Sequence, residues 1–340
     1  MDTMFCLVSR QSMANVIPVL MYKPQNVVLF ATPEEHKSAD FLQNLFKSKL
    51  INVKRINGLN AYDYLNFKKV VSDLLEKTNG DVWLNVTGGT KLMALAAYEA
   101  FAEKEKNIIY CDTDHQKIIF LYPENKVEKI QAAITIEDYL RSYGYRISET
   151  RDINYIKKFY DLFNYINTLN AMQSFIKFMN SVRENFSTTQ PRYTINSPDK
   201  KFRFIKEMDN FFIEYGYPSY KRIKLKFNEY QHGNWLEFYT FYVFEQKHKL
   251  NPLSGVKIVY FDGVENEIDL IFLKDYKLHI VSCKSGKKGN QYDLFQLETL
   301  RNITSGTFGK GIFITTKNPT SRFLDRARNL GIEVKHVIRL

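Results

Sequence analysis

The first third of the chain alternates between short apolar runs and longer amphipathic stretches, and no other feature constrains the fold as strongly. The apolar runs are Met4–Val8, Asn26–Ala31, Ile51–Ile56, Val82–Val86, Asn107–Tyr110 and Ile118–Tyr122. Strands that alternate with helices in this way predict an α/β domain with a doubly wound, Rossmann-like parallel sheet and helices on both faces. Within it, Thr32 followed by Pro33 predicts the start of a helix that ends near Lys49.

One loop of this domain has polar groups suited to a phosphate. It is the run Thr87, Gly88, Gly89, Thr90 and Lys91, between the fourth strand and the next helix. The glycines allow close backbone approach, the threonines and Lys91 offer hydroxyls and a cation, and the helix N-terminus favours an anion. The spacing matches neither a Walker loop nor a dinucleotide fingerprint, and a plain turn capped by Thr90 is the alternative. The residues expected on the same edge of the sheet, after the first strand, are Ser9, Arg10 and Gln11.

A second group of ionisable residues lies on a predicted β-hairpin near the C-terminus. The run Ile268–Leu273 is apolar except for Asp269, a turn follows at Asp275–Lys277, and Leu278–Cys283 leads to Lys284. A carboxylate beside an amine suits a site that acts on a phosphodiester. Asp269 would bind a divalent cation, while Lys284 would orient water or stabilise developing charge.

This hairpin resembles the core of PD-(D/E)xK nucleases, in which an Asp on one strand precedes an acid-x-Lys triplet on the next. The triplet here reads Ser282-Cys283-Lys284, so a serine stands where the family has an acid. The resemblance implies a metal contact from the Cys283 carbonyl, and a hard cation accepts carbonyl or hydroxyl oxygen in place of carboxylate.

One residue before the hairpin and one after it complete the expected site. Glu237 is the one acid in an apolar helical run over 233–244, and burying it without a partner would be costly. A metal shared with Asp269 would provide that partner, whereas an ion pair with a surface lysine is the alternative. Gln296, on the helix after Lys284, either orients substrate or water or has a surface role.

The composition excludes several classes of protein. A chain of 340 residues with 44% apolar residues has room for two domains with sizeable cores and is not disordered. There is no apolar run long enough to span a bilayer and no signal segment at the start, so we expect a cytoplasmic protein without membrane contact. Cys6, Cys111 and Cys283 are too scattered for a disulfide framework or a cysteine zinc site.

Positive charge is concentrated in the C-terminal part. Residues 1–140 have 16 Lys and Arg against 17 Asp and Glu, whereas residues 141–340 have 32 against 20. This asymmetry predicts a nucleic-acid partner, with a lysine-rich surface that serves only solubility as the alternative. The expected cationic face comprises Lys200, Lys201, Arg203, Lys206, Lys221, Arg222, Lys224, Lys226, Lys284, Lys287 and Lys288. Interleaved Tyr and Phe residues favour stacking of unpaired bases.

The two motifs together indicate a family. The Thr-Gly-Gly-Thr-Lys loop at 87–91 is similar to the signature of CARF domains, the sensors of cyclic oligoadenylates in type III CRISPR immunity. With Glu237, Asp269 and the Ser282–Lys284 triplet, the chain resembles CARF-fused ancillary nucleases, and the resemblance extends over 295–300 and 306–310. It implies a homodimer, an effector across the CARF dimer interface, and cleavage that depends on Mn²⁺ or Mg²⁺. A cyclic tetra-adenylate has the two-fold symmetry of such a dimer, and cyclic hexa-adenylate is the alternative.

We therefore expect a CARF domain over 1–140, a helical connector over 141–188 and a PD-(D/E)xK nuclease domain over 189–340. The connector helices, about 153–185, are expected to pack between the domains or across the dimer and to transmit the effector signal; a small winged-helix module is the alternative. The predicted function is effector-activated cleavage of DNA or RNA, single-stranded or by nicking. The alternatives are a non-catalytic nucleic-acid-binding regulator, in which Ser282 has disabled the metal site, and a ring nuclease that degrades the cyclic messenger.

Overall fold

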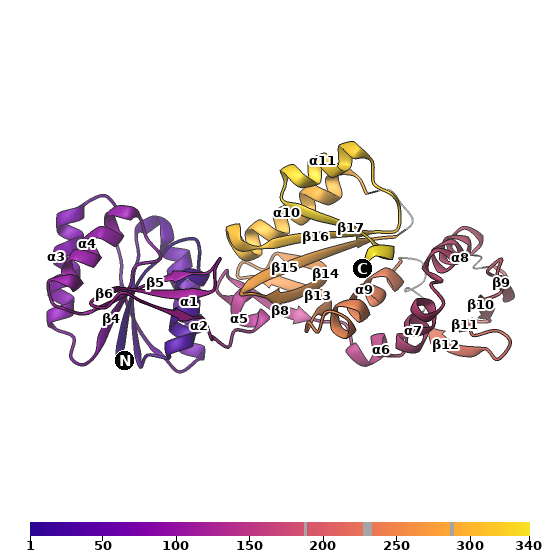
Figure 1. The fold of residues 1–340 in the computed structure, drawn as a ribbon, viewed down its shortest axis with the longest axis horizontal. Helices are drawn as coiled ribbons and strands as arrows, with labels where there is room; N and C mark the ends of the chain where they lie inside the picture. The colour runs from indigo at the N-terminus through magenta and orange to yellow at the C-terminus, as the bar shows by residue number, and fades with distance from the viewer. Residues whose placement is uncertain (187–188, 227–232, 286–288) are drawn as a thin grey trace.

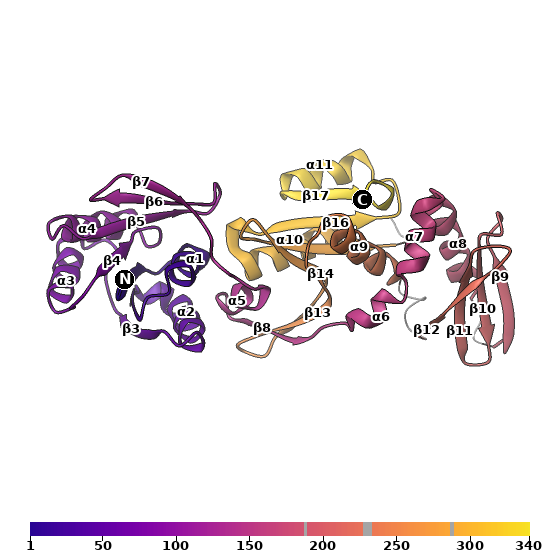
Figure 2. The ribbon, with the colours of Figure 1, turned by 60° about the horizontal axis from the view of Figure 1, so that its bottom comes forward.

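The computed structural model describes residues 1–186, 189–226, 233–285 and 289–340, and it contains three sheets that follow one another along the molecule (Figure 1). The N-terminal domain lies at one end, a mixed six-stranded sheet lies in the middle, and a small antiparallel sheet lies at the other end (Figure 2). In the described parts of the chain, no helix is long and apolar enough to cross a membrane.

The N-terminal sheet has the strand order β3-β2-β1-β4-β5-β6-β7. Its strands are β1 (Thr3–Leu7), β2 (Asn26–Phe30), β3 (Asn52–Ile56), β4 (Val82–Asn85), β5 (Asn107–Asp112), β6 (Lys117–Tyr122) and β7 (Lys126–Lys129). The strands β1 to β5 are parallel, and β6 and β7 add an antiparallel edge. The doubly wound sheet predicted from the sequence is confirmed.

Helices cover both faces of this sheet. They are α1 (Met13–Tyr22), α2 (His36–Ser48), α3 (Tyr64–Glu76) and α4 (Lys91–Ala102). Alternate residues of each strand point to opposite faces, so Met4 and Cys6 pack against α1 and α2 while Phe5 and Leu7 pack against α3 and α4. The helix expected to start at Pro33 instead begins with the 3₁₀ turn η1 (Pro33–Glu35), and α2 follows it directly.

The six-stranded sheet has the order β17-β16-β15-β14-β13-β8. Its strands are β8 (Tyr145–Glu149), β13 (Leu253–Tyr260), β14 (Glu265–Lys274), β15 (Lys277–Lys284), β16 (Lys310–Thr315) and β17 (Ile332–His336). The predicted hairpin is confirmed as β14 and β15, which are joined through Asp275 and Tyr276. Both of these residues have positive φ, as a tight hairpin turn of mirror-image type requires.

Helices cover this second sheet as well. They are α9 (Trp235–Gln246), α10 (Gln291–Ser305) and α11 (Ser321–Asn329), with 3₁₀ turns η2 (Gly306–Phe308) and η3 (Val337–Arg339). The helix α10 packs on β15 and β16, and α9 packs on β13, β14 and β15. Leu294 and Leu297 of α10 belong to one core, while the apolar side of α9 belongs to another.

The segment expected to be a helical connector is more varied. It contains the helices α6 (Ile153–Lys157), α7 (Tyr160–Thr168) and α8 (Met172–Asn185), and also β8, which pairs with β13 at the edge of the six-stranded sheet. The helix α5 (Ile136–Arg141) comes before this segment. The helices α6 to α8 do not lie between the two large domains (Figure 1). Their aromatic faces pack instead against α9 and the small sheet, because these provide the apolar surface that the helices bury.

The small sheet, called here the distal sheet, was not predicted. Its strands, in the order β12-β11-β10-β9, are β9 (Arg192–Asn196), β10 (Phe202–Glu207), β11 (Asn210–Tyr215) and β12 (Lys221–Leu225). All neighbouring strands are antiparallel. One face buries Phe202, Phe204 and Ile213 against α7 and α8. The predicted boundary at 188 lies outside the described residues.

The N-terminal domain and the six-stranded sheet share a continuous apolar core through α5. Tyr139 and Leu140 are fully buried in the same cluster as Met13 of α1 and Ile280 of β15. The helix α5 is fixed by a capping box, in which Thr135 and Asp138 bond to each other's backbone N–H groups, and Lys49 Nζ lies 2.6 Å from the Asp138 carboxylate. The two domains therefore meet in a packed interface rather than through a loose linker.

We predict that Asp138→Asn lowers the free energy of unfolding by about 1–2 kcal/mol at pH 7, as expected for a lost charged cap. Burial would raise the pKa of Asp138, but the hydrogen bonds from Lys49 and Thr135 outweigh it and hold the pKa below its usual value. The carboxylate therefore stabilises the fold above the unfolded pKa of about 3.9, and this contribution is lost as the pH falls through the folded pKa.

Denaturant unfolding of both proteins between pH 7 and about pH 3 measures this loss. Glu137→Gln is the control, since Glu137 forms only an exposed pair with Arg141 on the same helix. An Asp138→Asn protein as stable as the control at pH 7 would contradict the assignment.

Candidate functional site

The strands β14 and β15 part at the point where the acid and the lysine lie. Their pairing ends at Leu270 and Val281, whereas β15 continues to pair with β16 as far as Lys284. The Cys283 N–H therefore donates to the Asp269 carboxylate, with 2.6 Å between the backbone nitrogen of Cys283 and Oδ2 of Asp269. The Ser282 hydroxyl also hydrogen-bonds to Asp269. Burial nevertheless raises the pKa of Asp269 more than these bonds lower it.

Glu237 approaches the same place from α9. Its carboxylate is paired with Arg151, at 2.5 Å between Oε2 and Nη1, and both side chains are largely buried. Burial, followed by the negative charge of Asp269, raises the pKa of Glu237 to about 7 despite this pair. The ion-pair partner of Glu237 is thus Arg151, from the segment before α6, and not the surface lysine of the alternative; the shared metal stays a prediction.

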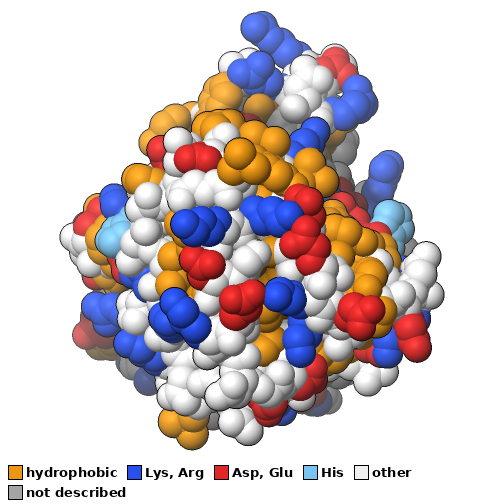
Figure 3. Space-filling model, turned by 90° about the vertical axis from the view of Figure 1, so that its left-hand side faces the viewer, with side chains coloured by type: hydrophobic (Ala, Val, Ile, Leu, Met, Phe, Trp, Pro, Cys, Tyr) orange, Lys and Arg blue, Asp and Glu red, His pale blue; other side chains and the backbone are white. Residues whose placement is uncertain are grey.

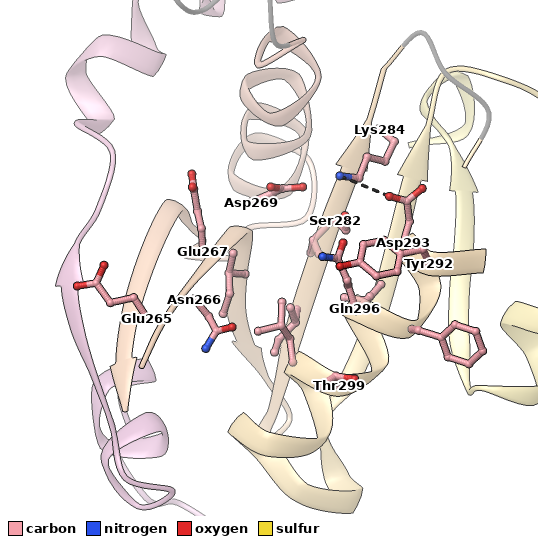
Figure 4. A pocket seen from close by; sticks show the side chains of 16 residues that line it. Glu265, Asn266, Glu267, Asp269, Ser282, Lys284, Tyr292, Asp293, Gln296 and Thr299 are labelled. Atoms are coloured by element: carbon pink, nitrogen blue, oxygen red, sulfur yellow. Dashed lines mark ion pairs between the residues drawn. The ribbon is translucent and has the colours of Figure 1, made fainter. Parts of the chain in front are cut away.

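An open cavity of about 550 Å³ lies between β14 and α10 and is lined by four of the predicted residues. Asp269, Ser282 and Lys284 line one side, and Gln296 lines the other from α10 (Figure 4). Asp293, on the first turn of α10, faces Lys284 with 3.7 Å between Oδ1 and Nζ. Glu237 is not among the described residues that line this cavity, although it is near enough to Asp269 for that charge to raise its pKa.

The donors available for a metal are oxygen atoms. In the described ranges, no three His, Cys, Asp or Glu side chains form a ready-made metal site. Asp269 and Glu237 supply two carboxylates, and a third protein donor would be a main-chain carbonyl such as that of Cys283. The Cys283 thiol is not a suitable ligand, because burial and the adjacent carboxylates raise its pKa well above the usual value.

The expected cationic face is only partly available. Lys206 is buried beside the Phe186 and Tyr193 rings, which corrects its expected exposure. Arg203 and Arg222 both pair with Glu214 on the outer face of the distal sheet. Lys200 and Lys224 are exposed. The expected Lys287 and Lys288 lie outside the described residues.

The loop at 87–91 is built mainly from internal contacts. A Cβ on Gly88 would lie 2.0 Å from the Leu7 carbonyl oxygen, so only glycine fits there. The Thr87 hydroxyl donates to Asn85 and accepts from the Cys111 N–H, and the Thr90 hydroxyl caps α4 and donates to the Ala61 carbonyl. Both hydroxyls therefore have hydrogen-bond partners within the fold.

A cavity of about 450 Å³ opens beside this loop at the carboxyl edge of the N-terminal sheet. Its lining residues include the predicted Ser9, Arg10, Gln11, Thr87 and Gly89. Arg10 is highly exposed, and its side chain lies 3.5 Å from Glu35. Lys91 is exposed at the start of α4 and does not line the cavity in the described part of this chain. On the outer face of this domain, acidic and basic side chains are interspersed (Figure 3), as its near-neutral charge predicts.

Sequence reasoning missed several residues at both cavities. Arg151 lies 86 positions before its partner Glu237. Asp293 lies 9 positions after Lys284. No local sequence pattern indicates that either residue belongs to the site. Asn15 and Asn85 hold the loop by a buried network, in which Asn85 donates to Asn15 and Asn15 donates to the Leu7 carbonyl. Asn85 could have been identified from the sequence, because it is a polar residue at the end of an apolar strand.

Comparisons with known proteins agree with this arrangement. Residues 3–139 match a family model described as the Card1 CARF domain, and residues 226–336 match the Card1-like endonuclease domain. No curated protein matches the sequence.

Solved structures share the whole fold. Can2 from Sulfobacillus thermosulfidooxidans, in complex with cyclic tetra-adenylate, is 25% identical with a TM-score of 0.76, covering 98% of this chain and 95% of that one. A Vibrio cholerae protein is 17% identical with a TM-score of 0.75, covering 99% and 94%. A type III CRISPR defence DNA nuclease activated by cyclic oligoadenylate is 18% identical with a TM-score of 0.62, covering 94% of this chain and 47% of that one.

We predict that Gly88→Ala lowers the free energy of unfolding by about 1–3 kcal/mol, the usual cost of overpacking. The Leu7 carbonyl that the new methyl group meets belongs to β1 and cannot move without breaking the sheet. Lys91→Ala, in the same loop but exposed, is the control and should unfold like the wild type. Equal midpoints for all three proteins in denaturant titrations would show that the loop tolerates the methyl group.

Proposed function

We propose that this chain is an endonuclease activated by a cyclic oligoadenylate in type III CRISPR defence. The chain belongs to the CARF-domain nucleases, because it has a Card1 CARF domain and a Card1-like endonuclease domain. One observation supports this most directly. A single chain has a cavity at the phosphate-suited edge of its CARF sheet and a second cavity in which Asp269 lies beside Lys284. A sensor without nuclease activity would not require the endonuclease cavity, and an endonuclease without an activator would not require the CARF cavity.

The endonuclease cavity suits phosphodiester hydrolysis by its charge pattern. Lys284 projects its ammonium group into the cavity, where it can bind a phosphate oxygen and stabilise the charge that grows during cleavage. Asp293 accepts the Asn290 N–H with one oxygen and faces Lys284 with the other, so it positions the lysine. Gln296, at the opposite wall, is placed to hold the substrate or an attacking water.

The family implies a divalent cation, and the acids present fit one. Asp269 and Glu237 are buried close together, and the charge of Asp269 contributes to the raised pKa of Glu237; this repulsion is what a shared cation would relieve. Asp269, Glu237 and the Cys283 carbonyl would hold it. When bound, such an ion supplies Lewis acidity and an activated water. The Ser282 hydroxyl, bonded to Asp269, orients that carboxylate in place of the missing acid.

The substrate is proposed to approach along the C-terminal end of β15. There, Arg183 of α8 donates to the Ser285 carbonyl, one residue after Lys284. The helix α8 in turn packs on the distal sheet, whose exposed lysines include Lys200 and Lys224. A polyanion that enters the cavity from this end meets cations on the way in, which favours nucleic acid, DNA or RNA, as substrate.

The CARF cavity is proposed to bind the activator, with cyclic tetra-adenylate as the first candidate. Can2, which shares the fold over nearly its whole length, was solved with that ring. In a homodimer, two copies of the 87–91 loop and of Arg10 would meet a two-fold symmetric ring with matching donors. The backbone N–H groups at the start of α4 favour its phosphates. The exposed Lys91 beside them does not line the cavity of a single chain, and it is proposed to add positive charge near its rim.

We predict that Asp269→Asn and Lys284→Ala each reduce cleavage about a hundredfold or more, the scale of losing a metal ligand or a placed charge. The assay uses labelled single- and double-stranded DNA and RNA with Mg²⁺ or Mn²⁺ and cyclic tetra-adenylate. A site with only two carboxylates should bind metal weakly, so Mn²⁺ should support cleavage better than Mg²⁺ and Ca²⁺ should not support it.

Lys257→Ala is the control for these variants, since Lys257 lies on the same sheet but is exposed and paired with Glu149. Full cleavage by either site variant would rule out this cavity as the active site. Sequence-independent binding without cleavage by the wild type under all conditions would favour the non-catalytic regulator instead.

For the activator, Lys91→Ala should raise the cyclic tetra-adenylate concentration that gives half-maximal cleavage by about tenfold, the effect of one lost phosphate contact. The saturated rate should stay close to that of the wild type, because the residue is remote from the endonuclease cavity. Lys69→Ala, another exposed lysine of the CARF domain, on α3, is the control. A Lys91→Ala curve that overlays the wild-type curve would remove Lys91 from the activator site.

A further inference from the structure

The activator cavity of the CARF domain is completed by a residue of the endonuclease domain. Phe308, in the 3₁₀ turn η2 after α10, lines it together with Gln11 and with Tyr110, Asp112 and Asp114 from the β5–β6 hairpin. Phe308 is half-buried and belongs to none of the apolar cores formed by the described residues. Its ring is therefore available at the cavity rather than required by the endonuclease fold.

A second contact lies beside it. A Cβ on Gly306, at the end of α10, would lie 2.8 Å from the Gln11 Oε1 atom, so the Gln11 amide touches the backbone of this turn. That Oε1 atom is buried and accepts no hydrogen bond from the described residues. A buried acceptor without a donor is unfavourable, so a donor supplied by a ligand in the cavity would favour a rearrangement of the Gln11 amide beside Gly306.

The helix α10 leads from this contact to the endonuclease cavity. Its 15 residues span about 22 Å at 1.5 Å per residue. At the far end, Asp293 caps the helix with Asn290 and faces Lys284, and Gln296 lines the endonuclease cavity. A displacement of η2 along or around the axis of α10 would therefore move the groups that face Lys284.

The strand β15 connects the same two places but has less freedom. Lys277 at its start pairs with Asp114 of the activator cavity, at 2.6 Å, and Lys284 is its last residue. Hydrogen bonds to β14 and β16 on either side fix the strand. The ion pair therefore anchors the CARF cavity to the sheet, while α10, which packs on one face of the sheet, is the element able to shift against it.

We propose that Phe308 contacts the bound cyclic oligoadenylate and that α10 transmits this contact to Lys284, Asp293 and Gln296. The proposal rests on the proposed function, and it assigns the signal to α10 instead of α6 to α8, which lie beyond the endonuclease sheet from the CARF domain (Figure 1). An activator shifts an equilibrium only through contacts that differ between two arrangements of the protein. The Phe308 ring can make such a contact, because adenine bases stack on aromatic side chains.

The test compares Phe308→Ala with a matched aromatic deletion at the same domain interface. Phe261 is also in the endonuclease domain and contacts Phe41 of α2, with 5.4 Å between ring centroids, but it does not line the activator cavity. Binding of cyclic tetra-adenylate by the full-length protein is measured calorimetrically, and cleavage is measured over a full activator titration. Hydrogen exchange of the first two turns of α10 is followed with and without the ring.

For Phe308→Ala we expect at least a tenfold lower saturated cleavage rate, weaker binding of the ring, and loss of the ring-dependent change in hydrogen exchange at 293–297. Phe308→Tyr, which keeps the ring, should retain most of the response, and Phe261→Ala should respond like the wild type. A Phe308→Ala protein that reaches the wild-type saturated rate, with or without weaker binding, overturns the role of α10. A wild type that the ring does not activate refutes the proposed function itself, so the two failures are distinguishable.

Discussion

The endonuclease cavity depends on one electrostatic constraint, the burial of Asp269 and Glu237 close to each other. Two carboxylates taken out of water repel and resist ionisation, and burial raises the pKa of both. The surrounding structure offsets this with the Arg151 guanidinium, the Cys283 N–H and the nearby Lys284. The local divergence of β14 from β15 makes room for these contacts, since a fully paired hairpin would have used the Cys283 N–H in its ladder.

A second constraint is the continuous core between the CARF and endonuclease domains. Because Tyr139 and Leu140 are buried in the same cluster as residues of both sheets, the domains cannot rotate freely about a linker. Movement that links the two cavities must then occur within packed elements. The sheet is fixed by its hydrogen bonds, while α10 lies on its face. Asp293 of α10 lines the endonuclease cavity, and Phe308, in the turn directly after α10, lines the CARF cavity.

The basic residues of the C-terminal part fall into two groups, which the net charge alone does not distinguish. Arg151, Arg203 and Arg222 neutralise buried or half-buried acids, so they support the fold. Lysines such as Lys200 and Lys224 are exposed, as the proposed nucleic-acid substrate would require. The distal sheet shows this division on its own surface, where arginines pair with Glu214 and lysines extend to solvent.

The sequence by itself determined the strand and helix alternation of the CARF domain and the β14–β15 hairpin, because apolar periodicity and turn chemistry are local properties. It also predicted that Asp269, Ser282 and Lys284 belong together, since two strands of one hairpin have a fixed register. Only the tertiary structure decided that Arg151 pairs with Glu237, that α6 to α8 pack on the distal sheet, and that Phe308 lines the CARF cavity. Each of these depends on which surfaces meet when separate segments pack. Such a contact leaves no periodic signal along the chain, as Arg151 and Glu237, 86 positions apart, illustrate.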